Sequence, residues 1–467
     1  MKIRDLVAGL RRTSGQGSSR SPLRSTLARN SLWMLAGQLA RTLVQAAYFV
    51  CLARALGVSG YGAFVGVTAL VAILAPYVGW GAGVLLIQGT VRDTSTFRAW
   101  WGYAISATIV SGAALVLVVV ALSRVVLPGT IGVGLVCAIG LADLVFNRLV
   151  EVSGQAALAF HQLRRTAQLQ VLPTFVRMLA AAAMLLSPAL ATPGGWALLY
   201  LAATAAASVV AVALVSADHG LPQLRGSLRL RQAQNGFYFS VAMSAQSVYN
   251  DIDKTLLARL GTLSSVGIYG AAYRIMDVSF IPVRSLLAAA YARFFEHGAA
   301  GMGAALGFAR RLVPLAAAYA AAAGLALYLV APLLPLVLGD EFTETVQAVR
   351  WLAVIPLLRA LHCFAADALT GADRQGIRSA IQVAVAVVCV GLNLWLIPLY
   401  SWRGAAGASI ACDALLVVGM WGAVWRVWSR TRAPLAADGT AAADRAAPAL
   451  WVERRADAAV PVHGGRP

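Results

Sequence analysis

The sequence predicts an all-helical polytopic membrane protein, with about twelve transmembrane helices in two parallel six-helix repeats. The first observation is composition: 60% of the 467 residues are hydrophobic, 12% are charged and the mean hydropathy is +0.74. Soluble domains are about 45–50% apolar and about 25% charged. The second is that apolar runs near the span length of about 20 residues recur along the chain. The third is that short motifs recur between its halves. An ordinary soluble domain and a disordered chain are both excluded.

Apolar runs separated by polar or Pro/Gly turns place the twelve spans. Their limits are 29–53, 61–87, 99–122, 128–158, 167–190, 195–216, 236–259, 266–290, 310–338, 345–371, 377–399 and 403–427. The fourth and ninth are the least regular, and Pro332 and Pro335 interrupt the ninth. A kink is tolerated there because neighbouring helices can satisfy the freed backbone groups.

Positive charge is distributed unevenly between the two sides of the predicted membrane. The chain holds 38 Lys and Arg against 19 Asp and Glu, a net charge of +19. With the N-terminal tail in the cytoplasm, 26 of these cations fall in cytoplasmic tails and loops, and five on the opposite side. Cytoplasmic loops of membrane proteins collect Arg and Lys. The bias therefore predicts an inner-membrane-type protein with both termini in the cytoplasm.

The spans and polar segments divide the chain into five parts. These are a basic cytoplasmic N-terminal tail at 1–28, a first six-helix bundle at 29–216, a cytoplasmic linker at 217–235, a second six-helix bundle at 236–428 and a disordered cytoplasmic tail at 429–467. The apolar run after the first tail is too long for a signal-peptide core. The last part is Ala, Pro, Gly and charge without periodicity, which is typical of disorder.

Three landmarks recur in the same order in the two halves. They are Asn30 and Asn235, Arg54 and Arg259, and Tyr61-Gly62 and Tyr269-Gly270. The offset is 205 residues at the first two landmarks and 208 at the third. An even number of spans separates the copies, so both have the same orientation. Parallel repeats related by an axis along the membrane normal are a transporter architecture, with the substrate site between the halves.

These motifs carry a resemblance to a known family. Asn30, Arg54, Leu56-Gly57 and Tyr61-Gly62, with Asp251-x-Asp253-Lys254 and Gly267-x-Tyr269-Gly270, resemble polysaccharide biosynthesis flippases. These are O-antigen-type oligosaccharide flippases of the multidrug/oligosaccharidyl-lipid/polysaccharide exporter superfamily. The resemblance covers about residues 29–428. It implies two six-helix bundles in a V around a central cavity.

The resemblance also implies a function. Such a flippase moves undecaprenyl-diphosphate-linked oligosaccharide across the bacterial cytoplasmic (inner) membrane by alternating access, for O-antigen, capsule or exopolysaccharide biosynthesis. The implied partners are that lipid-linked oligosaccharide, membrane lipids, polysaccharide polymerase machinery, and a proton or sodium ion for coupling. No nucleic acid and no cofactor is expected.

Ionisable residues inside the predicted spans are the candidate site residues. A charge at the bilayer centre costs about 2.5–3.5 kcal/mol on insertion scales, so it should face protein or water. A guanidinium fork also matches a phosphate with two parallel hydrogen bonds. The predicted substrate-binding residues are Arg41, Arg148, Arg177, Lys254, Arg274 and Arg284. Arg41 is the strongest candidate because no acid lies within four positions; the alternative is a partner across helices, such as Asp251 or Asp253.

Two aspartates in the seventh span are candidates for ion coupling. Asp251 and Lys254 are three residues apart and can pair on one helix face, which leaves Asp253 without a local partner. One of the two aspartates would exchange a proton during transport. The alternative is a structural salt-bridge knot that holds the bundles together.

The other intramembrane charges allow structural interpretations. Arg274 and Asp277 are expected to pair structurally, whereas Arg284 has no local acid and Arg177 could extend to the interface. The fourth span carries a polar stripe that is either self-neutralised by Arg148 and Glu151 or forms a cavity wall. Its members are Asp143, Asn147, Arg148 and Glu151, and weaker candidates are Arg359, His362, Asp367 and Asp413.

Enzymatic and ATP-driven functions are not supported by motifs. The five cysteines are scattered without a C-x-x-C pair, and no HExxH, GxSxG or Walker A loop is present. Short outer loops argue against a polymerase or ligase. The alternative function is a small-molecule efflux antiporter on the same fold, although the excess of intramembrane cations favours an anionic cargo. Lipid II flippases usually carry two further helices.

Overall fold

The structure, a computed structural model, describes residues 22–223 and 247–443, and within them every regular element is a helix. The first half comprises α2 (Pro22–Leu74), α3 (Ala82–Arg92), α4 (Phe97–Val126), α5 (Val133–Leu141), α6 (Asn147–Ala159), α7 (Leu163–Leu186) and α8 (Pro193–His219). The second half comprises a helix at 247–260, α10 (Leu263–Ser279), α11 (Ile281–Ala299), α12 (Met302–Val330), α13 (Leu334–Leu338), α14 (Thr345–Leu352), α15 (Ile355–Gly371), α16 (Gln375–Tyr400) and α17 (Trp402–Ala443). The all-helical prediction is confirmed.

A helix occupies the position of every predicted span. Nine helical stretches of the described chain are long and apolar enough to cross a membrane, or ten with the α10–α11 pair, which bends by 48°. One of the nine, Ala40–Arg92, holds two predicted spans because α2 changes direction at Gly57. The helix at 247–260 is the described part of the seventh span. Residues 236–246 of that span lie outside the described residues.

The chain ends differ from the predicted limits. Helix α2 begins at Pro22, ahead of the predicted start at 29, and α17 continues to Ala443, where the sequence predicts disorder from 429 onward. The extension of α17 is rich in alanine, the residue with the highest helix propensity. The rest of both predicted tails and residues 224–235 of the predicted linker lie outside the described residues.

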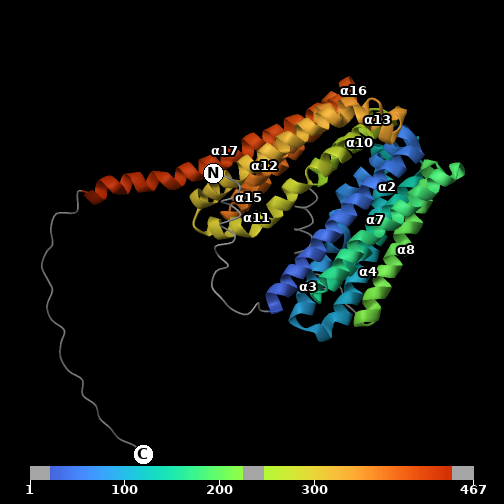
Figure 1. Cartoon of the computed structure of the whole chain (residues 1–467), viewed down its shortest axis with the longest axis horizontal. Coiled ribbons are helices and arrows are strands. Elements are labelled where there is room, and N and C mark those ends of the chain that lie inside the picture. Colours follow the sequence, from blue (N-terminus) through green and yellow to red (C-terminus); the bar gives the residue numbers. More distant parts are fainter. Residues whose placement is uncertain (1–21, 224–246, 444–467) are drawn as a thin grey trace, which may run out of the picture.

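The two halves form separate bundles arranged as a V (Figure 1). Helices α2 to α8 form one arm and α10 to α17 form the other. The arms meet where α2, α10 and α13 come together, which we call the joined end. They diverge towards α3 and α11, at what we call the open end. This is the arrangement that the family resemblance implies.

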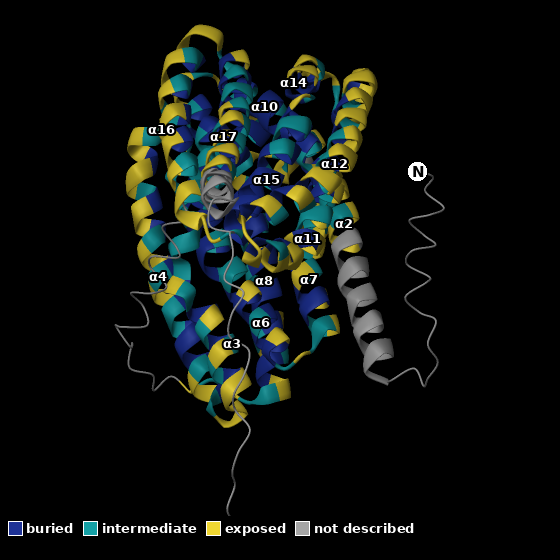
Figure 2. Ribbon diagram, turned by 90° about the vertical axis from the view of Figure 1, so that its left-hand side faces the viewer, coloured by how far each residue is buried: buried dark blue, intermediate teal, exposed yellow. Residues whose placement is uncertain are grey.

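The outer faces of both arms are apolar and exposed, as expected of a surface in contact with lipid. Buried segments concentrate inside the bundles, and exposed ones follow the outer sides of α12 and α16 (Figure 2). Leu329 on α12 is 66% exposed and Val387 on α16 is 68% exposed. Lipid tails are as apolar as these side chains, so a bilayer accounts for them.

The joined end is held by a reciprocal crossing of the second half of α2 and α10. A Cβ on Gly62 would lie 1.8 Å from the carbonyl oxygen of Leu263, and a Cβ on Gly267 would lie 2.0 Å from that of Val58. Gly267 is 205 positions after Gly62, and Leu263 is 205 positions after Val58, so each contact is the repeat equivalent of the other. Each glycine therefore lets the backbone of the other repeat approach, and the crossing is two-fold symmetric.

A hydrogen bond marks the axis of this symmetry and fixes the repeat register. The hydroxyls of Ser59 and Ser264 are 2.8 Å apart, and these residues are also separated by 205 positions. The equivalent of Gly62 is therefore Gly267. The sequence alignment of Gly62 with Gly270, at an offset of 208, is wrong at this crossing. That alignment matched the Tyr-Gly pairs of the two halves, whereas the helix contact matches Gly62 with Gly267.

Polar contacts close the same end. Arg54 donates from Nε to the carbonyl oxygen of Val337 at 2.6 Å, and the carboxylate of Glu341 accepts from the backbone N–H of Val58 at 2.9 Å. Glu341 thus caps the start of the second helical segment of α2, where a negative charge is favourable. Gly57 adopts φ +65° at this bend, and a Cβ there would lie 2.6 Å from the Glu341 carboxylate.

Candidate functional site

A cavity of about 600 Å³ lies between the two arms of the V. Both bundles contribute to its walls: α2, α6, α7 and α8 from the first, and the helix at 247–260, α10, α11 and α15 from the second. Pockets of small-molecule sites range from about 300 to 1,000 Å³. The cavity is large enough for a polar headgroup.

The cavity wall is strongly cationic. All six predicted substrate-binding residues line it, and Arg359 is a seventh cation; Asp143, Asp251 and Asp277 are its three carboxylates. Charges in such a location are costly unless they are paired or hydrated. Carboxylates behind the wall pair with some of these cations, and the arginines that have no such pair offer an environment for an anion.

Three of the lining arginines have no ion-pair partner in the described part of the chain. They are Arg41, Arg274 and Arg284. Arg41 and Arg284 are exposed, and Arg274 is half-buried. The predicted pair of Arg274 with Asp277 is wrong. Asp277 accepts instead from Arg359 at 2.9 Å, because α15 packs close to α10 and brings a guanidinium nearer than the helix's own i,i+3 neighbour.

The first bundle positions Arg177 by contacts across three helices. Its NH2 lies 2.9 Å from Asp143, its Nε donates to Thr204 at 2.9 Å, and its guanidinium stacks over the ring of Tyr200 at 4.1 Å. Tyr200 also donates to Asp143 at 2.8 Å. Asp143 lies in a one-turn π-helix at Ala142–Phe146, a feature frequent at functional sites. Extension of Arg177 to the interface is not observed.

The polar stripe of α6 serves both interpretations that the sequence allows. Arg148 pairs with Glu151 at 2.5 Å, so the local neutralisation forms. Asp143, Asn147 and Arg148 also line the cavity. Arg148 therefore lies in the cavity wall while Glu151 lies beside it, and both side chains remain partly exposed, at 29% for Arg148 and 47% for Glu151.

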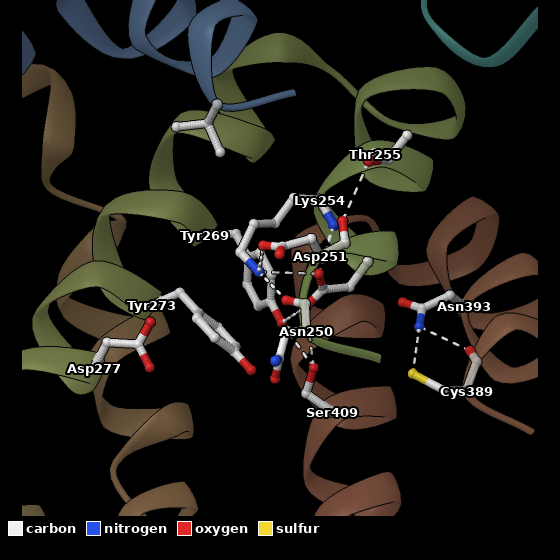
Figure 3. Close-up of polar contacts among 12 residues, drawn as sticks. Asn250, Asp251, Lys254, Thr255, Tyr269, Tyr273, Asp277, Cys389, Asn393 and Ser409 are labelled. Atoms are coloured by element: carbon white, nitrogen blue, oxygen red, sulfur yellow. Dashed lines mark hydrogen bonds and ion pairs between the residues drawn. The ribbon is translucent and has the colours of Figure 1, made fainter. Parts of the chain in front are cut away.

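The second bundle holds Lys254 between two aspartates, and Figure 3 shows the lysine side chain beside Asp251. Its Nζ lies 3.3 Å from Asp251 and 3.2 Å from Asp253. The prediction that Asp253 lacks a local partner is wrong, because the flexible lysine stem reaches the adjacent residue. Asp253 is 1% exposed and also accepts from Tyr269 at 2.5 Å and Ser409 at 3.3 Å. Only Asp251 of the two aspartates lines the cavity.

A buried charge cluster around Arg359 lies behind this wall. Arg359 contacts Asp277, lies 3.7 Å from Asp413 and donates to the hydroxyl of Tyr273. Asp413 lies 3.2 Å from His362. The sequence placed Arg359, His362 and Asp413 among the weaker candidates, since their connection across α10, α15 and α17 has no local signature.

The remaining weaker candidate, Asp367, lies apart from this cluster. It is 3.4 Å from Arg378 and does not line the cavity.

Tyrosines are among the lining residues that the sequence analysis missed. Tyr48, Tyr200 and Tyr273 all line the cavity, and the Tyr48 hydroxyl is buried without a hydrogen-bond partner in the described residues. Each lies inside a predicted span rather than at its end, where interfacial anchoring is the usual role of aromatic residues. Position within the span was the available signal.

The arrangement presents groups that can hold an anion. Its walls present guanidinium groups and hydroxyls that can donate to an anion. Among the described residues, no group of three or more His, Cys, Asp or Glu side chains is placed to hold a metal ion. The geometry is that of a polar, largely cationic cavity between two helical bundles.

Comparisons with solved structures show the fold. An inward-facing multidrug resistance MATE family transporter of the MOP superfamily matches with a TM-score of 0.67 at 15% identity, over 88% of this chain and 99% of the other. The lipid II flippase MurJ in an inward closed conformation matches with 0.65 at 12% identity, over 84% and 87%. An outward-facing MATE transporter matches with 0.55 at 15% identity, over 87% and 96%. No curated protein matches the sequence.

A comparison of the sequence with protein-family models identifies the family of the chain. The model described as polysaccharide biosynthesis protein matches residues 27–295. This match covers more than half of the chain and includes the first bundle, the helix at 247–260 and the crossing at the joined end. The chain is a member of the polysaccharide biosynthesis protein family.

Proposed function

We propose that the protein is a flippase that moves an undecaprenyl-diphosphate-linked oligosaccharide across the bacterial cytoplasmic membrane for surface polysaccharide biosynthesis. The observation that carries the proposal is the cavity wall with seven cations, of which Arg41, Arg274 and Arg284 lack ion-pair partners among the described residues. A diphosphate supplies the missing negative charge. The polar headgroup would travel between the arms while the apolar tail stays in lipid.

The orientation follows from the loop charges. Helix ends at the open end carry arginines such as Arg92, Arg164 and Arg374, and the positive side of a membrane protein faces the cytoplasm. The open end is then cytoplasmic and the joined end faces outward. The better match to an inward-facing transporter supports this conformation. In it, the cavity is ready to receive a cytoplasmic substrate.

Alternating access supplies the transport cycle. The joined end would separate after loading, and the open end would close. Polysaccharide polymerase machinery on the outer side would then consume the released unit. Small-molecule efflux antiport on the same scaffold remains the alternative function, and an organic cation is disfavoured by the charge of the cavity.

Removing the unpaired arginines is expected to slow flipping without unfolding the protein. A hydrogen bond to a charged group contributes about 1.5–3 kcal/mol, so Arg274→Gln and Arg284→Gln should each reduce flipping of fluorescent undecaprenyl-diphosphate-linked sugar in proteoliposomes by roughly 10- to 100-fold. Arg41→Gln should act similarly. Arg293→Gln, an exposed position on the same helix as Arg284, is the matched control.

The outcomes distinguish the two candidate functions. Unchanged flipping in all three cavity variants would remove the diphosphate assignment. Wild-type proteoliposomes that fail to flip the lipid probe but exchange a small organic solute for protons would favour efflux antiport.

We further propose that Asp251 is the carboxylate that couples transport to an ion. It lines the cavity and faces Lys254 at 3.3 Å, whereas Asp253 is buried among Lys254, Tyr269 and Ser409. A group that exchanges a proton with solution needs access to water, and only Asp251 has it. Asp253 would then have a structural role, holding Lys254 in place by its ion pair.

The two aspartates are expected to respond differently to substitution. Asp251→Asn should flatten the dependence of the flipping rate on an imposed pH gradient while keeping the melting temperature near that of the wild type. Asp253→Asn should lower the melting temperature in detergent. A wild-type pH response in folded Asp251→Asn would contradict the coupling role.

A further inference from the structure

We propose that a side pocket at a break in the second membrane span binds the sugar ring attached directly to the diphosphate. The proposal rests on the proposed function, because it assigns the glycan part of the same cargo. The pocket has a volume of about 300 Å³ and shares Ala72 and Arg148 with the central cavity. It therefore adjoins the place where the diphosphate would lie.

The floor of the side pocket is irregular backbone. Between α2 and α3, the short segment Ala75–Gly81 contains three non-helical residues, Val78, Gly79 and Trp80. Gly79 and Gly81 both have positive φ, at +71° and +75°. Irregular backbone at membrane depth is tolerated only where it is buried in protein or lines a water-filled cavity. Val78, Gly79 and Gly81 line this pocket.

Polar side chains from both arms surround that floor. Thr108, Glu151 and Gln155 come from the first bundle, and Ser247 comes from the second. The pocket thus contains hydroxyl, amide and carboxylate groups together with the guanidinium of Arg148. Groups of these kinds exchange hydrogen bonds with the vicinal hydroxyls of a sugar. The contribution of Ser247 also makes the pocket depend on the arrangement of the two arms.

Two polar atoms of side chains that line this pocket are buried and lack partners, and a ligand that reached them would supply what each one misses. Among the described residues, Gln155 Oε1 accepts no hydrogen bond and Arg148 Nε donates none. Buried polar groups are normally satisfied, so each exception calls for an explanation. The first atom needs a donor and the second needs an acceptor.

This pair of requirements fits a hydroxylated ligand. A metal cation cannot accept from Arg148, and a fully ionised phosphate cannot donate to Gln155. A sugar hydroxyl does both, because it carries one donor and two acceptor lone pairs. Glu151, paired with Arg148 and 47% exposed, adds acceptors for a neighbouring hydroxyl.

The position of Gln155 is built into the local backbone. A Cβ on Gly83 would lie 1.5 Å from Gln155 Oε1, so the amide packs against a glycine backbone at the start of α3. Any larger residue at 83 would displace the amide from the pocket. The break in the helix, the glycine and the unpaired amide are therefore parts of one arrangement.

Arg148 connects the two compartments and sets the order of the ligand groups. It lines both the central cavity and the side pocket. With the diphosphate among the cavity arginines, the first sugar is the group that reaches Arg148 and Gln155. The pocket would then recognise that first ring, and the distal sugars would extend into the central cavity.

The test compares lipid probes that differ only in the sugar. Full-length purified protein in nanodiscs is titrated with undecaprenyl diphosphate, and with the same lipid carrying one N-acetylglucosamine or one galactose. The wild type should bind at least one glycosylated probe more tightly than the bare diphosphate. Gln155→Leu should weaken that binding by about three- to tenfold, the value of a neutral hydrogen bond, and leave the bare lipid unaffected. Gln88→Leu, an exposed glutamine on α3, is the matched control.

Each outcome bears on a separate proposal. Equal affinity of the wild type for bare and glycosylated lipid, or a Gln155→Leu loss shared by all probes, would overturn the side pocket while leaving the flippase assignment intact. No binding of any lipid by folded wild-type protein would overturn the proposed function itself. Gly83→Ala provides a second route, because it should reproduce the selective loss by moving the amide without removing it.

Discussion

Replacing Gly62 or Gly267 by alanine is expected to open the joined end and trap the protein facing outward. Each new Cβ would lie within about 2 Å of a backbone carbonyl oxygen, at Leu263 for Gly62 and at Val58 for Gly267. A backbone atom cannot rotate away as a flexible side chain can. Overpacking costs about 1–3 kcal/mol, which at the upper limit shifts a two-state equilibrium by more than 100-fold.

A cross-link measures this shift directly. The Ser59 and Ser264 hydroxyls are 2.8 Å apart on the symmetry axis, so Ser59→Cys and Ser264→Cys should form a disulfide readily in the present conformation. Addition of Gly62→Ala or Gly267→Ala should suppress that disulfide, detected as a linked peptide by mass spectrometry, and should abolish flipping. Gly194→Ala is the matched control, because open space surrounds that position on α8.

The symmetry of the crossing adds a quantitative expectation. The two glycines make equivalent contacts with the opposite repeat, so both substitutions should suppress the cross-link to a similar degree. Undiminished cross-linking in either variant would mean that the joined end accommodates a methyl group. The crossing would then be an ordinary packing contact rather than the place where the outer gate closes.

The sequence could predict the fold because the membrane imposes it. Apolar runs of span length and the cation bias are local or compositional signals, and a helix is found at each predicted span. The six candidate cations could also be found, since a charge inside an apolar run must face protein or water. All six line one cavity.

Partners across helices could not be predicted in this way. The i,i+3 spacing describes contacts on one helix face only. It therefore predicted an ion pair of Asp277 with Arg274, whereas the actual partner, Arg359, is 82 positions away on another helix. The same spacing predicted no partner for Asp253, because adjacent side chains on a helix point in different directions. The side chain of Lys254 is long enough to reach Asp253 nevertheless. The equivalence of Gly62 and Gly267 required the contact itself, since a glycine carries no side-chain signature.

Replacing Arg359 by glutamine is expected to produce the largest loss of stability among the cavity substitutions. Its side chain is 9% exposed and contacts both Asp277 and Asp413, the latter 1% exposed. Removing one partner of a buried ion pair typically costs about 3–5 kcal/mol, because the remaining charge is left uncompensated. Denaturant unfolding in detergent should show this loss, with Arg284→Gln, whose guanidinium has no ion-pair partner in the described chain, unfolding like the wild type.

A double variant separates two causes of the lost stability, the uncompensated buried charge and the lost side-chain packing. In Arg359→Gln with Asp413→Asn, the uncompensated carboxylate is neutral, so part of the lost stability should return; this coupling is what a double-mutant cycle measures. Asp413→Asn paired with Arg284→Gln should show no such recovery. If Arg359→Gln unfolded like Arg284→Gln, Arg359 would belong with the unpaired arginines of the binding wall. The effects of substitution on stability and on flipping would then no longer separate the seven cations into those that hold the fold and those that face the substrate.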